Sequence, residues 1–211
     1  ENGCCEHIRK GLENLDKHIA NMQHMGQSVI VTLNRFGSDT DEEIAIVSEH
    51  CKEKGIGFAL NEAYMKGSEG CMDLARLAVD EIAANPSRDI TYCYADTDTV
   101  QDKITAVATR IYGAKKVVFK KQALKMIERI SQWQLEHFPI CIAKTQYSLS
   151  DDSKRYGVPK DFTLTISDLV INTGAEMIVV IAGDIMRMPG LPRHPQAERI
   201  DIQDGLLVGL E

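Results

Sequence analysis

Two aromatic residues, Phe36 and Tyr64, stand in loops that each follow a short apolar run of the sequence. The first loop covers residues 34–38 and the second covers residues 61–67. Two aromatic planes that face one crevice could hold a flat heterocycle, such as adenine or a pterin, between them. Aromatic side chains mostly form cores, so packing of one or both rings against the loops is the alternative interpretation.

Phosphate binding is the second chemistry to consider. Residues 67–70 read Gly-Ser-Glu-Gly ahead of an expected helix, and glycines at a helix N-terminus can turn backbone N–H groups toward an anion. A plain loop, in which Ser68 or Glu69 caps the first turn, is the simpler interpretation. The sequence contains no G-x-x-x-x-G-K-[ST], and no G-x-G-x-x-G follows a strand. It therefore shows no recognisable motif for cradling a triphosphate.

Two further segments carry notable side chains. Residues 144–152 read Lys-Thr-Gln-Tyr-Ser-Leu-Ser-Asp-Asp, directly after an apolar run. A serine nucleophile there would need a histidine base nearby in space, which spacing cannot place. Residues 183–192 hold two Met, two Pro and two Gly, and such a loop could wall a pocket or form a subunit contact. An ordinary surface connector is the alternative.

The cysteines indicate a reducing compartment. The six are Cys4, Cys5, Cys51, Cys71, Cys93 and Cys141. There is no C-x-x-C, and no Cys/His spacing matches a zinc site. Three of them, Cys51, Cys71 and Cys141, lie in apolar-periodic segments, where a free thiol packs as a small hydrophobe. We therefore expect reduced thiols, a cytoplasmic location and no metal site.

Hydrophobic periodicity defines the elements that must position the two aromatic loops. The pattern predicts a helix over residues 6–25 and a strand over 28–33 that is buried on both faces. A second helix begins at residues 39–43, four of which are acidic, and a strand over 58–60 and a helix over 69–84 follow. The expected inward residues of the three helices are Leu12, Leu15, Ile19 and Met22, then Ile44, Val47 and Cys51, then Leu74, Ala78 and Ile82. Alternating strands and helices with short loops indicate parallel strands. Ligands of such sheets bind beyond the carboxyl ends of the strands, which is where both aromatic loops begin.

The pattern changes after residue 88. Val100, Ile104, Val107 and Ile111 mark a helix that ends at Gly113. A strand over 117–119, a helix over 122–134, and strands over 140–143, 162–169, 177–182, 199–202 and 207–210 follow. The sequence thus predicts an α/β fold: parallel βαβ units in the N-terminal part, then a mixed α/β part with several C-terminal strands. We place the subdomains at residues 1–88 and 89–211.

Composition excludes several classes of protein. The chain has 211 residues, of which 44% are hydrophobic, and a formal net charge of −7. An acidic chain argues against a nucleic-acid partner, and the apolar runs are too short to cross a membrane. Bases such as Arg35, Lys66, Lys115 and Lys116 would have to offset the acidity near an anionic substrate. Because the chain begins with Glu1 rather than Met, we interpret it as processed or trimmed from a larger protein.

Several longer stretches resemble formate–tetrahydrofolate ligase. They are residues 11–19, 33–36 with 39–40, 66–70, 111–114, 139–152, and 183–186 with 188–192. Their order and spacing fit this family across nearly the whole chain, and the runs KTQYSLSDD and MPGLP are the most specific. The resemblance covers the C-terminal portion of the family only, because its P-loop lies in a large N-terminal domain.

The resemblance implies an activity and a set of site residues. Family members use ATP, with Mg²⁺, to phosphorylate formate, and then pass the formyl group to N10 of tetrahydrofolate. Carried over by position, Asn34, Phe36, Gly37, Leu60 and Tyr64 line the pocket for the flat ring of nucleotide or pterin. Tyr64 stands where the family usually has Trp, and Gly37-Ser38 replaces the usual Pro-Thr. No catalytic residue is expected within this chain.

Three hypotheses remain open on the sequence. The chain is part of an enzyme that needs the P-loop domain, or a folate- or nucleotide-binding module without catalysis, or a scaffold for oligomerisation. The expected partners are formate, ATP, tetrahydrofolate, the P-loop N-terminal domain and further copies in a homo-oligomer.

Overall fold

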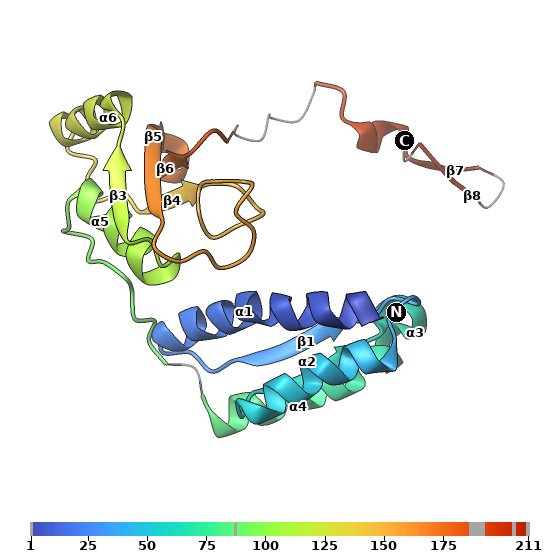
Figure 1. The fold of residues 1–211 in the computed structure, drawn as a ribbon. Helices are drawn as coiled ribbons and strands as arrows, with labels where there is room; N and C mark the ends of the chain where they lie inside the picture. Colours follow the sequence, from blue (N-terminus) through green and yellow to red (C-terminus); the bar gives the residue numbers. More distant parts are fainter. Residues whose placement is uncertain (1, 87, 186–192, 204–205, 210–211) are drawn as a thin grey trace.

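The N-terminal part of the chain is built on a pair of parallel strands. The computed structural model describes residues 2–86, 88–185, 193–203 and 206–209. Helix α1 (Asn2–His24) leads into β1 (Ile30–Asn34), α2 (Asp41–Glu53) and β2 (Gly57–Asn61). A short helix α3 (Ala63–Lys66), a 3-10 turn η1 (Gly67–Cys71) and helix α4 (Met72–Ala84) follow. Figure 1 shows these elements together at one end of the molecule.

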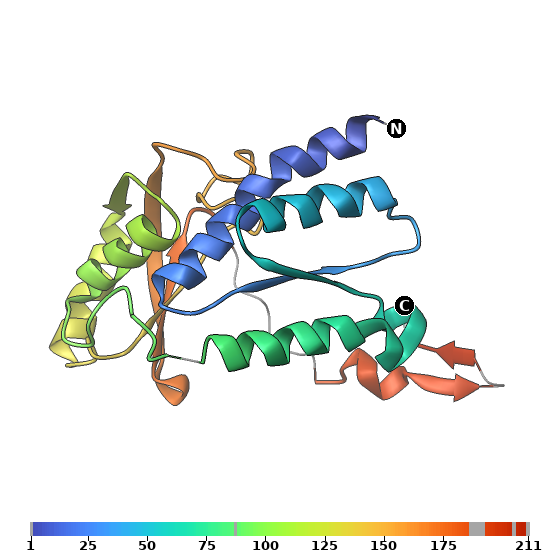
Figure 2. The same ribbon diagram turned by 90° about the horizontal axis from the view of Figure 1, so that it is seen from below.

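The two strands pair in register from Ile30–Gly57 to Asn34–Asn61. Helices α1 and α2 cover one side of the pair and α4 covers the other, as Figure 2 shows. Ile19, Val31 and Cys51 form the buried centre of the α1–β1–α2 layer. The parallel crossover places the carboxyl ends of both strands at one edge, as the sequence predicts.

Three details of the predicted packing are wrong. The first strand is not buried on both faces: Thr32 is exposed, and the sheet of β1 has two strands in the part of the chain that the structure describes. Met22 is exposed, and its neighbour Asn21 is buried instead, because the amide of Asn21 donates to the carbonyl oxygen of Ile111 at 3.1 Å. Ile82 is also exposed, because α4 turns Leu74, Leu77 and Ala78 toward the sheet.

The C-terminal part is organised around a four-stranded mixed sheet. Its order is β3-β5-β6-β4, with β3 parallel to β5, β5 antiparallel to β6, and β4 parallel to β6. The strands are β3 (Lys116–Phe119), β4 (Ile140–Ala143), β5 (Thr163–Asn172) and β6 (Met177–Ala182), with the 3-10 turn η3 (Thr173–Ala175) between the last two. Helix α5 (Val100–Ala106), the π-helical segment η2 (Val107–Ile111) and helix α6 (Lys121–Gln132) complete this part. The predicted single helix from Val100 to Ile111 is thus α-helical only in its first half.

This second part has a core of its own. Fourteen buried apolar residues fill the space between the sheet and the helices, among them Ile104, Ile130, Leu164 and Val180. Cys141, expected to pack inward, is exposed because β4 is an edge strand. The fold is therefore of the predicted α/β class, with a parallel strand pair followed by a mixed sheet.

The last described residues form a 3-10 turn η4 (Gln196–Arg199) and a hairpin of β7 (Asp201–Gln203) and β8 (Leu206–Val208). Figure 1 draws this hairpin apart from the four-stranded sheet. Most of the Met/Pro/Gly-rich run, residues 186–192, lies outside the described residues, as does residue 210 of the last predicted strand. No helix in the described ranges is long and apolar enough to span a membrane.

Candidate functional site

The two aromatic loops start side by side at the carboxyl ends of β1 and β2. Asn34 and Asn61 are register partners, and the side-chain amide of Asn61 donates to Oδ1 of Asn34 at 2.9 Å. One residue later, the backbone N–H of Arg35 donates to the carbonyl oxygen of Asn61 at 3.0 Å. The pairing of β1 and β2 thus continues by one backbone hydrogen bond, and both loops begin next to the Asn34–Asn61 pair. Leu60, a predicted site residue, is half-buried on β2 directly before this point.

The loop after β1 is a tight turn that presents Phe36. The backbone N–H of Phe36 donates to the carboxylate of Asp39 at 2.8 Å, and the N–H of Asp39 donates back to the carbonyl oxygen of Phe36 at 3.1 Å. Thr40 and Glu43 then form a capping box that starts α2. The turn leaves the ring of Phe36 65% exposed. Gly37 is exposed as well, with open space where a Cβ would stand.

The loop after β2 presents Tyr64 on the single turn α3. Oδ1 of Asn61 accepts the backbone N–H of Ala63 at 3.0 Å, which fixes the start of this turn. Tyr64 follows with 96% of its surface exposed. Among the described residues, neither Phe36 nor Tyr64 contacts another aromatic ring. The exposure of both residues leaves ring surface open to solvent, most of all at Tyr64.

Charged side chains connect the two loops. The carboxylate of Glu62 is 17% exposed and pairs with Lys66 at 2.7 Å, while Arg35 of the other loop lies 3.8 Å away. Arg35 also pairs with Asp41 at 2.7 Å. Two of the four bases proposed from the sequence, Arg35 and Lys66, are therefore brought to this site by Glu62.

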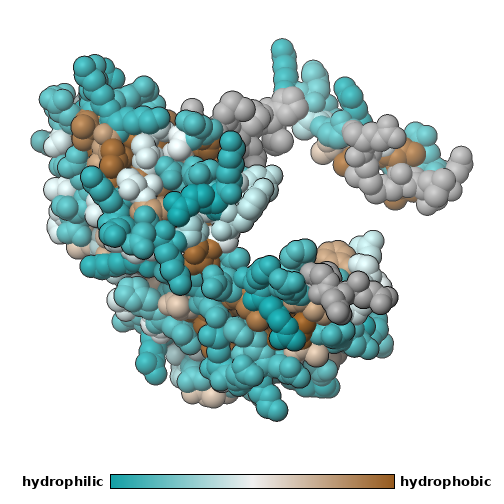
Figure 3. Space-filling view, viewed as in Figure 1, coloured by the Kyte–Doolittle hydropathy of each residue, from teal (hydrophilic) through white to brown (hydrophobic). Residues whose placement is uncertain are grey.

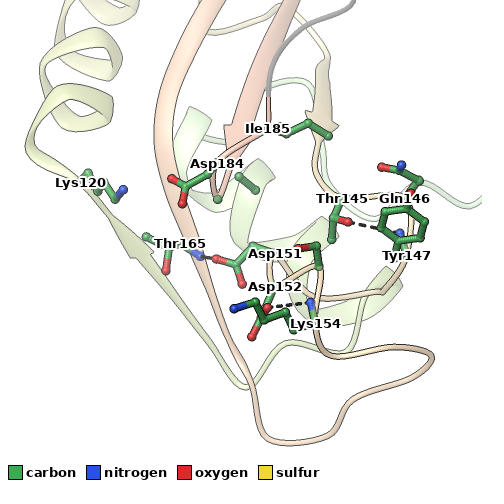
Figure 4. A pocket seen from close by; sticks show the side chains of 13 residues that line it. Lys120, Thr145, Gln146, Tyr147, Asp151, Asp152, Lys154, Thr165, Asp184 and Ile185 are labelled. Carbon is green, nitrogen blue, oxygen red and sulfur yellow. Dashed lines mark hydrogen bonds between the residues drawn. The ribbon is translucent and has the colours of Figure 1, made fainter.

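A separate polar hollow lies in the C-terminal part of the molecule. It encloses about 700 Å³ at the ends of β4 and β6 and is lined by Lys120, Thr145, Gln146, Tyr147, Asp151, Asp152, Ser153, Lys154, Thr165, Ala182, Gly183, Asp184 and Ile185. Figure 4 shows Lys120 on one side and Tyr147 on the other, with Asp151 between them. Asp151 accepts the backbone N–H of Thr165 at 2.8 Å, and Asp152 accepts that of Lys154 at 2.9 Å. Two carboxylates of this hollow thus accept hydrogen bonds from backbone N–H groups.

The serines of the KTQYSLSDD run hold a turn. Ser148 and Ser150 are buried, and their hydroxyl oxygens lie 3.0 Å apart. The N–H of Ser150 donates to the hydroxyl of Ser148, and the N–H of Asp152 donates to that of Ser150. Within the described part of the chain, no histidine bonds to either hydroxyl. The arrangement therefore gives no support to a serine nucleophile.

Lys144, which begins this run, is bonded to the backbone of its own loop. Its Nζ donates to the carbonyl oxygens of Thr145 and Ser148 and lies 5.0 Å from the centre of the Tyr112 ring. Burial lowers the pKa of Lys144, and the charge of Asp151 opposes that shift. Burial, together with Cys141, raises the pKa of Tyr112. Both groups stabilise the loop where it meets the sheet.

Comparison with known proteins places this architecture. The family model for formate–tetrahydrofolate ligase matches residues 1–211. The chain belongs to this ligase family. It is 55% identical over 205 residues to the formate–tetrahydrofolate ligase of Parabacteroides distasonis, covering 97% of this chain and 37% of that protein. The ligase of Bacteroides fragilis is 52% identical over the same shares, and that of Caldicellulosiruptor saccharolyticus is 50% identical over 202 residues, which are 95% of this chain and 36% of that one.

The chain thus spans a little over a third of the length of these ligase relatives, about 37%. The resemblance noted in the sequence is confirmed at the level of the family. The ring-binding role of Asn34, Phe36, Gly37, Leu60 and Tyr64 stays a prediction. The structure brings their loops to one edge of the strand pair.

Three residues that the sequence analysis did not assign to the site shape its loops: Asn61 and Glu62 connect the two loops, and Gly70 packs against the second. Asn61 carried a usable signal, because it ends the second strand as Asn34 ends the first. Glu62 and Lys66 stand four residues apart, a spacing typical of ion pairs on one helical turn. Nothing in the sequence marks the backbone contact that Gly70 makes with this loop.

Proposed function

We propose that the chain is the C-terminal part of an ATP-dependent formate–tetrahydrofolate ligase, and that the loops after β1 and β2 form a ring-stacking wall of its active site. The observation that carries this proposal is the pair of exposed rings, Phe36 and Tyr64, at the carboxyl ends of adjacent parallel strands. Ligands of parallel sheets bind at this edge. Each ring offers an aromatic face that a pterin or an adenine can cover, for about 1 kcal/mol beyond area burial.

The reaction divides into two group transfers. An oxygen of formate attacks the terminal phosphorus of ATP, and ADP leaves with the electrons of the broken P–O bond. N10 of tetrahydrofolate then attacks the carbon of formyl phosphate, inorganic phosphate leaves, and N10 loses its proton. In this proposal the present chain orients the ring of the substrate, while Mg²⁺, the phosphates of ATP and the catalytic groups are held by a P-loop domain outside it.

A partner domain is supported by surfaces of this chain that are incompletely covered. In the described part of the chain the parallel sheet has two strands, whereas parallel sheets are normally larger, so β1 and β2 each keep an edge that pairs with no other described strand. Helix α4 exposes Met72, Val79 and Ile82 along one face. Figure 3 shows a mainly hydrophilic surface with small apolar patches. We propose that the P-loop domain, or another copy in a homo-oligomer, packs against these elements.

The division into subdomains 1–88 and 89–211 belongs to the same proposal. Two clusters of buried residues support it, since one is drawn from α1, β1 and α2 and the other from elements after residue 99. Helix α1 joins them: Lys17 and Asn21 donate to the carbonyl oxygens of Arg110 and Ile111. A cytoplasmic location is supported by the free thiols of Cys5, Cys51, Cys71, Cys93 and Cys141.

Two measurements on the purified chain test the proposal. We expect no 10-formyltetrahydrofolate from ATP and formate, because the P-loop is elsewhere, and product formed by the pure chain would contradict this. We expect calorimetry to detect binding of tetrahydrofolate or MgADP that Tyr64→Ala weakens and Tyr156→Ala does not. Binding without any activity, even when a P-loop domain is supplied, would favour the binding-module alternative. Absence of binding would contradict a ring site preformed in this chain and favour a scaffold.

A further inference from the structure

Gly70 packs its backbone directly against the peptide that begins the Tyr64 loop. A Cβ atom at this position would lie 2.5 Å from both the carbonyl carbon and oxygen of Glu62, and 3.0 Å from the nitrogen of Ala63. The Glu62 N–H also donates to the carbonyl oxygen of Gly70 at 2.9 Å. The crowding atoms belong to the backbone, so no side-chain rotation can relieve the contact. Any other residue would push the two segments apart.

Other glycines near the site have no such neighbour. Gly67, three residues earlier, and Gly37, in the first loop, have nothing within 4 Å of a Cβ. The expected cap by Ser68 or Glu69 is not seen, because α4 begins after Cys71 and its N-terminus has no side-chain capping hydrogen bond. Gly67–Cys71 is a single 3-10 turn of five residues, and its last glycine serves as a packing surface for the strand-to-helix peptide.

The peptide held by Gly70 carries one contact with the first loop and two bonds within the second. Glu62 pairs with Lys66 and lies 3.8 Å from Arg35 of the first loop, and Ala63 donates to the side chain of Asn61. Tyr64 comes next, and its ring is 96% exposed. With so little packing of its own, the place from which this ring projects is set by the backbone that bears it.

We propose that Gly70 is a positioning residue of the ring site: it lets the Glu62–Ala63 peptide lie flat on the η1 turn and so fixes Tyr64 relative to Phe36. The inference rests on the proposed function of these loops as a ring-binding wall. A residue with a Cβ at position 70 displaces the peptide and turns Tyr64 away from the ligand position, while the cores of both parts stay intact.

The first experiment measures the position of the loop without a ligand. In the full chain, the Glu62 amide is expected to exchange with solvent as slowly as amides inside α4, because it is bonded to Gly70. Gly70→Ala should accelerate that exchange and shift the fluorine resonance of fluorotyrosine-labelled Tyr64. The matched control is Ser68→Ala, which removes an atom from the same exposed turn and should change neither signal. A fast Glu62 amide in the unaltered chain overturns the inference even if Gly70→Ala fails to fold, and so does an unchanged spectrum in a folded variant.

The second experiment links the loop position to ring binding. Tetrahydrofolate is titrated into the unaltered chain, Tyr64→Ala, Gly70→Ala and the double variant. Each single variant should weaken binding by about 2- to 10-fold, the range that corresponds to one aromatic contact. The double variant should bind no more weakly than Tyr64→Ala, because Gly70 acts only through that ring. If Gly70→Ala weakened binding by destabilising the whole chain, the double variant would instead bind more weakly than Tyr64→Ala.

The outcomes separate this inference from the proposed function. If Tyr64→Ala binds as well as the unaltered chain, the ring-binding function fails, and the exchange and fluorine data alone decide the role of Gly70. If Tyr64→Ala weakens binding and Gly70→Ala does not, the ring site stands and the positioning inference is overturned.

Discussion

The side-chain amide of Asn61 donates to Oδ1 of Asn34 across the ends of the two parallel strands, at 2.9 Å. The same Asn61 accepts the backbone N–H of Ala63 through its Oδ1 at 3.0 Å. One side chain therefore ties the first aromatic loop to the second and also starts the turn that bears Tyr64. Its position, immediately after β2, lets it reach both partners.

Asn61→Ala should reduce the free energy of unfolding more than Asn34→Ala does. The first substitution removes two hydrogen bonds and the second removes one, each worth about 0.5–1.5 kcal/mol. Urea denaturation of both variants and of the double variant measures the coupling between them. Asn172→Ala, at the exposed end of β5, is the control and should stay within about 0.5 kcal/mol of the unaltered chain. Equal losses in Asn61→Ala and Asn34→Ala would show that the bond to Ala63 contributes nothing.

Tyr64→Trp should strengthen binding of tetrahydrofolate by roughly 0.5–1 kcal/mol, because indole offers a larger stacking face than phenol. The free energy of unfolding should change by less than about 0.5 kcal/mol, since the side chain is 96% exposed. Calorimetric titration gives the affinity, and Tyr156→Trp on the exposed loop of the C-terminal part is the control. The same gain in both variants would point to non-specific stacking rather than to a site at Tyr64.

The sequence was sufficient to predict the strand pair and the edge at which both aromatic loops emerge. Two short runs rich in apolar residues, separated by a helix with acidic residues in its first turn, leave few alternatives to a parallel crossover. The inward face of α4 was predicted in part: Leu74 and Ala78 lie on it, but Ile82 does not. A second apolar stripe of Met72, Val79 and Ile82 lies on the other side of the helix, so local periodicity does not separate the two faces. The exposure of Cys141 depends on β4 being an edge strand, which follows from sheet order rather than from local pattern. The contact of Gly70 with Glu62 is a tertiary backbone contact that has no sequence signal.

Asp16 should make the stability of the α1–α2 contact depend on pH. Its carboxylate lies 2.7 Å from Nε2 of His50 and 3.0 Å from Nζ of Lys54. Burial alone would raise the pKa of Asp16. The hydrogen bonds and charges of His50 and Lys54 outweigh burial, so the net pKa lies below the ordinary 3.8. A lowered pKa in the folded state means that stability is fully contributed above about pH 3.8 and is lost as the pH falls through the folded-state value.

Asp16→Asn therefore tests this linkage. Near neutral pH we expect it to lower the free energy of unfolding by about 0.5–1 kcal/mol, the range for partly exposed pairs. The difference from the unaltered chain should shrink steadily as the pH is lowered below 3.8. Denaturant titrations at a series of pH values measure it, with Asp80→Asn on the exposed side of α4 as the control. A difference that is constant over this series would exclude Asp16 as the titrating group.

Lys103 is a fully buried ammonium group that holds the segment entering β4. Its Nζ donates to the carbonyl oxygens of Glu136 at 2.7 Å and Phe138 at 3.4 Å, and lies 5.5 Å from the centre of the Tyr94 ring. Burial lowers its pKa below 10.5, and Asp96, Asp98 and Glu136 oppose the shift. The folded chain therefore binds fewer protons than the unfolded chain between the folded-state value and 10.5, so this group contributes more stability as the pH rises through that window.

Lys103→Met keeps the length of the side chain and removes its donors. We expect a loss of about 1–3 kcal/mol in the free energy of unfolding near neutral pH, because two carbonyl oxygens in a packed region lose their partner. The unaltered chain gains stability as the pH rises toward 10.5, because the buried lysine can lose its charge, and the variant has no such group. The stability difference between the two chains should therefore grow over that range. Thermal and urea unfolding measure both effects, and Lys125→Met on the exposed face of α6 is the matched control. A Lys103→Met chain as stable as the control would mean that water satisfies these carbonyls and that the ammonium group contributes no net stability.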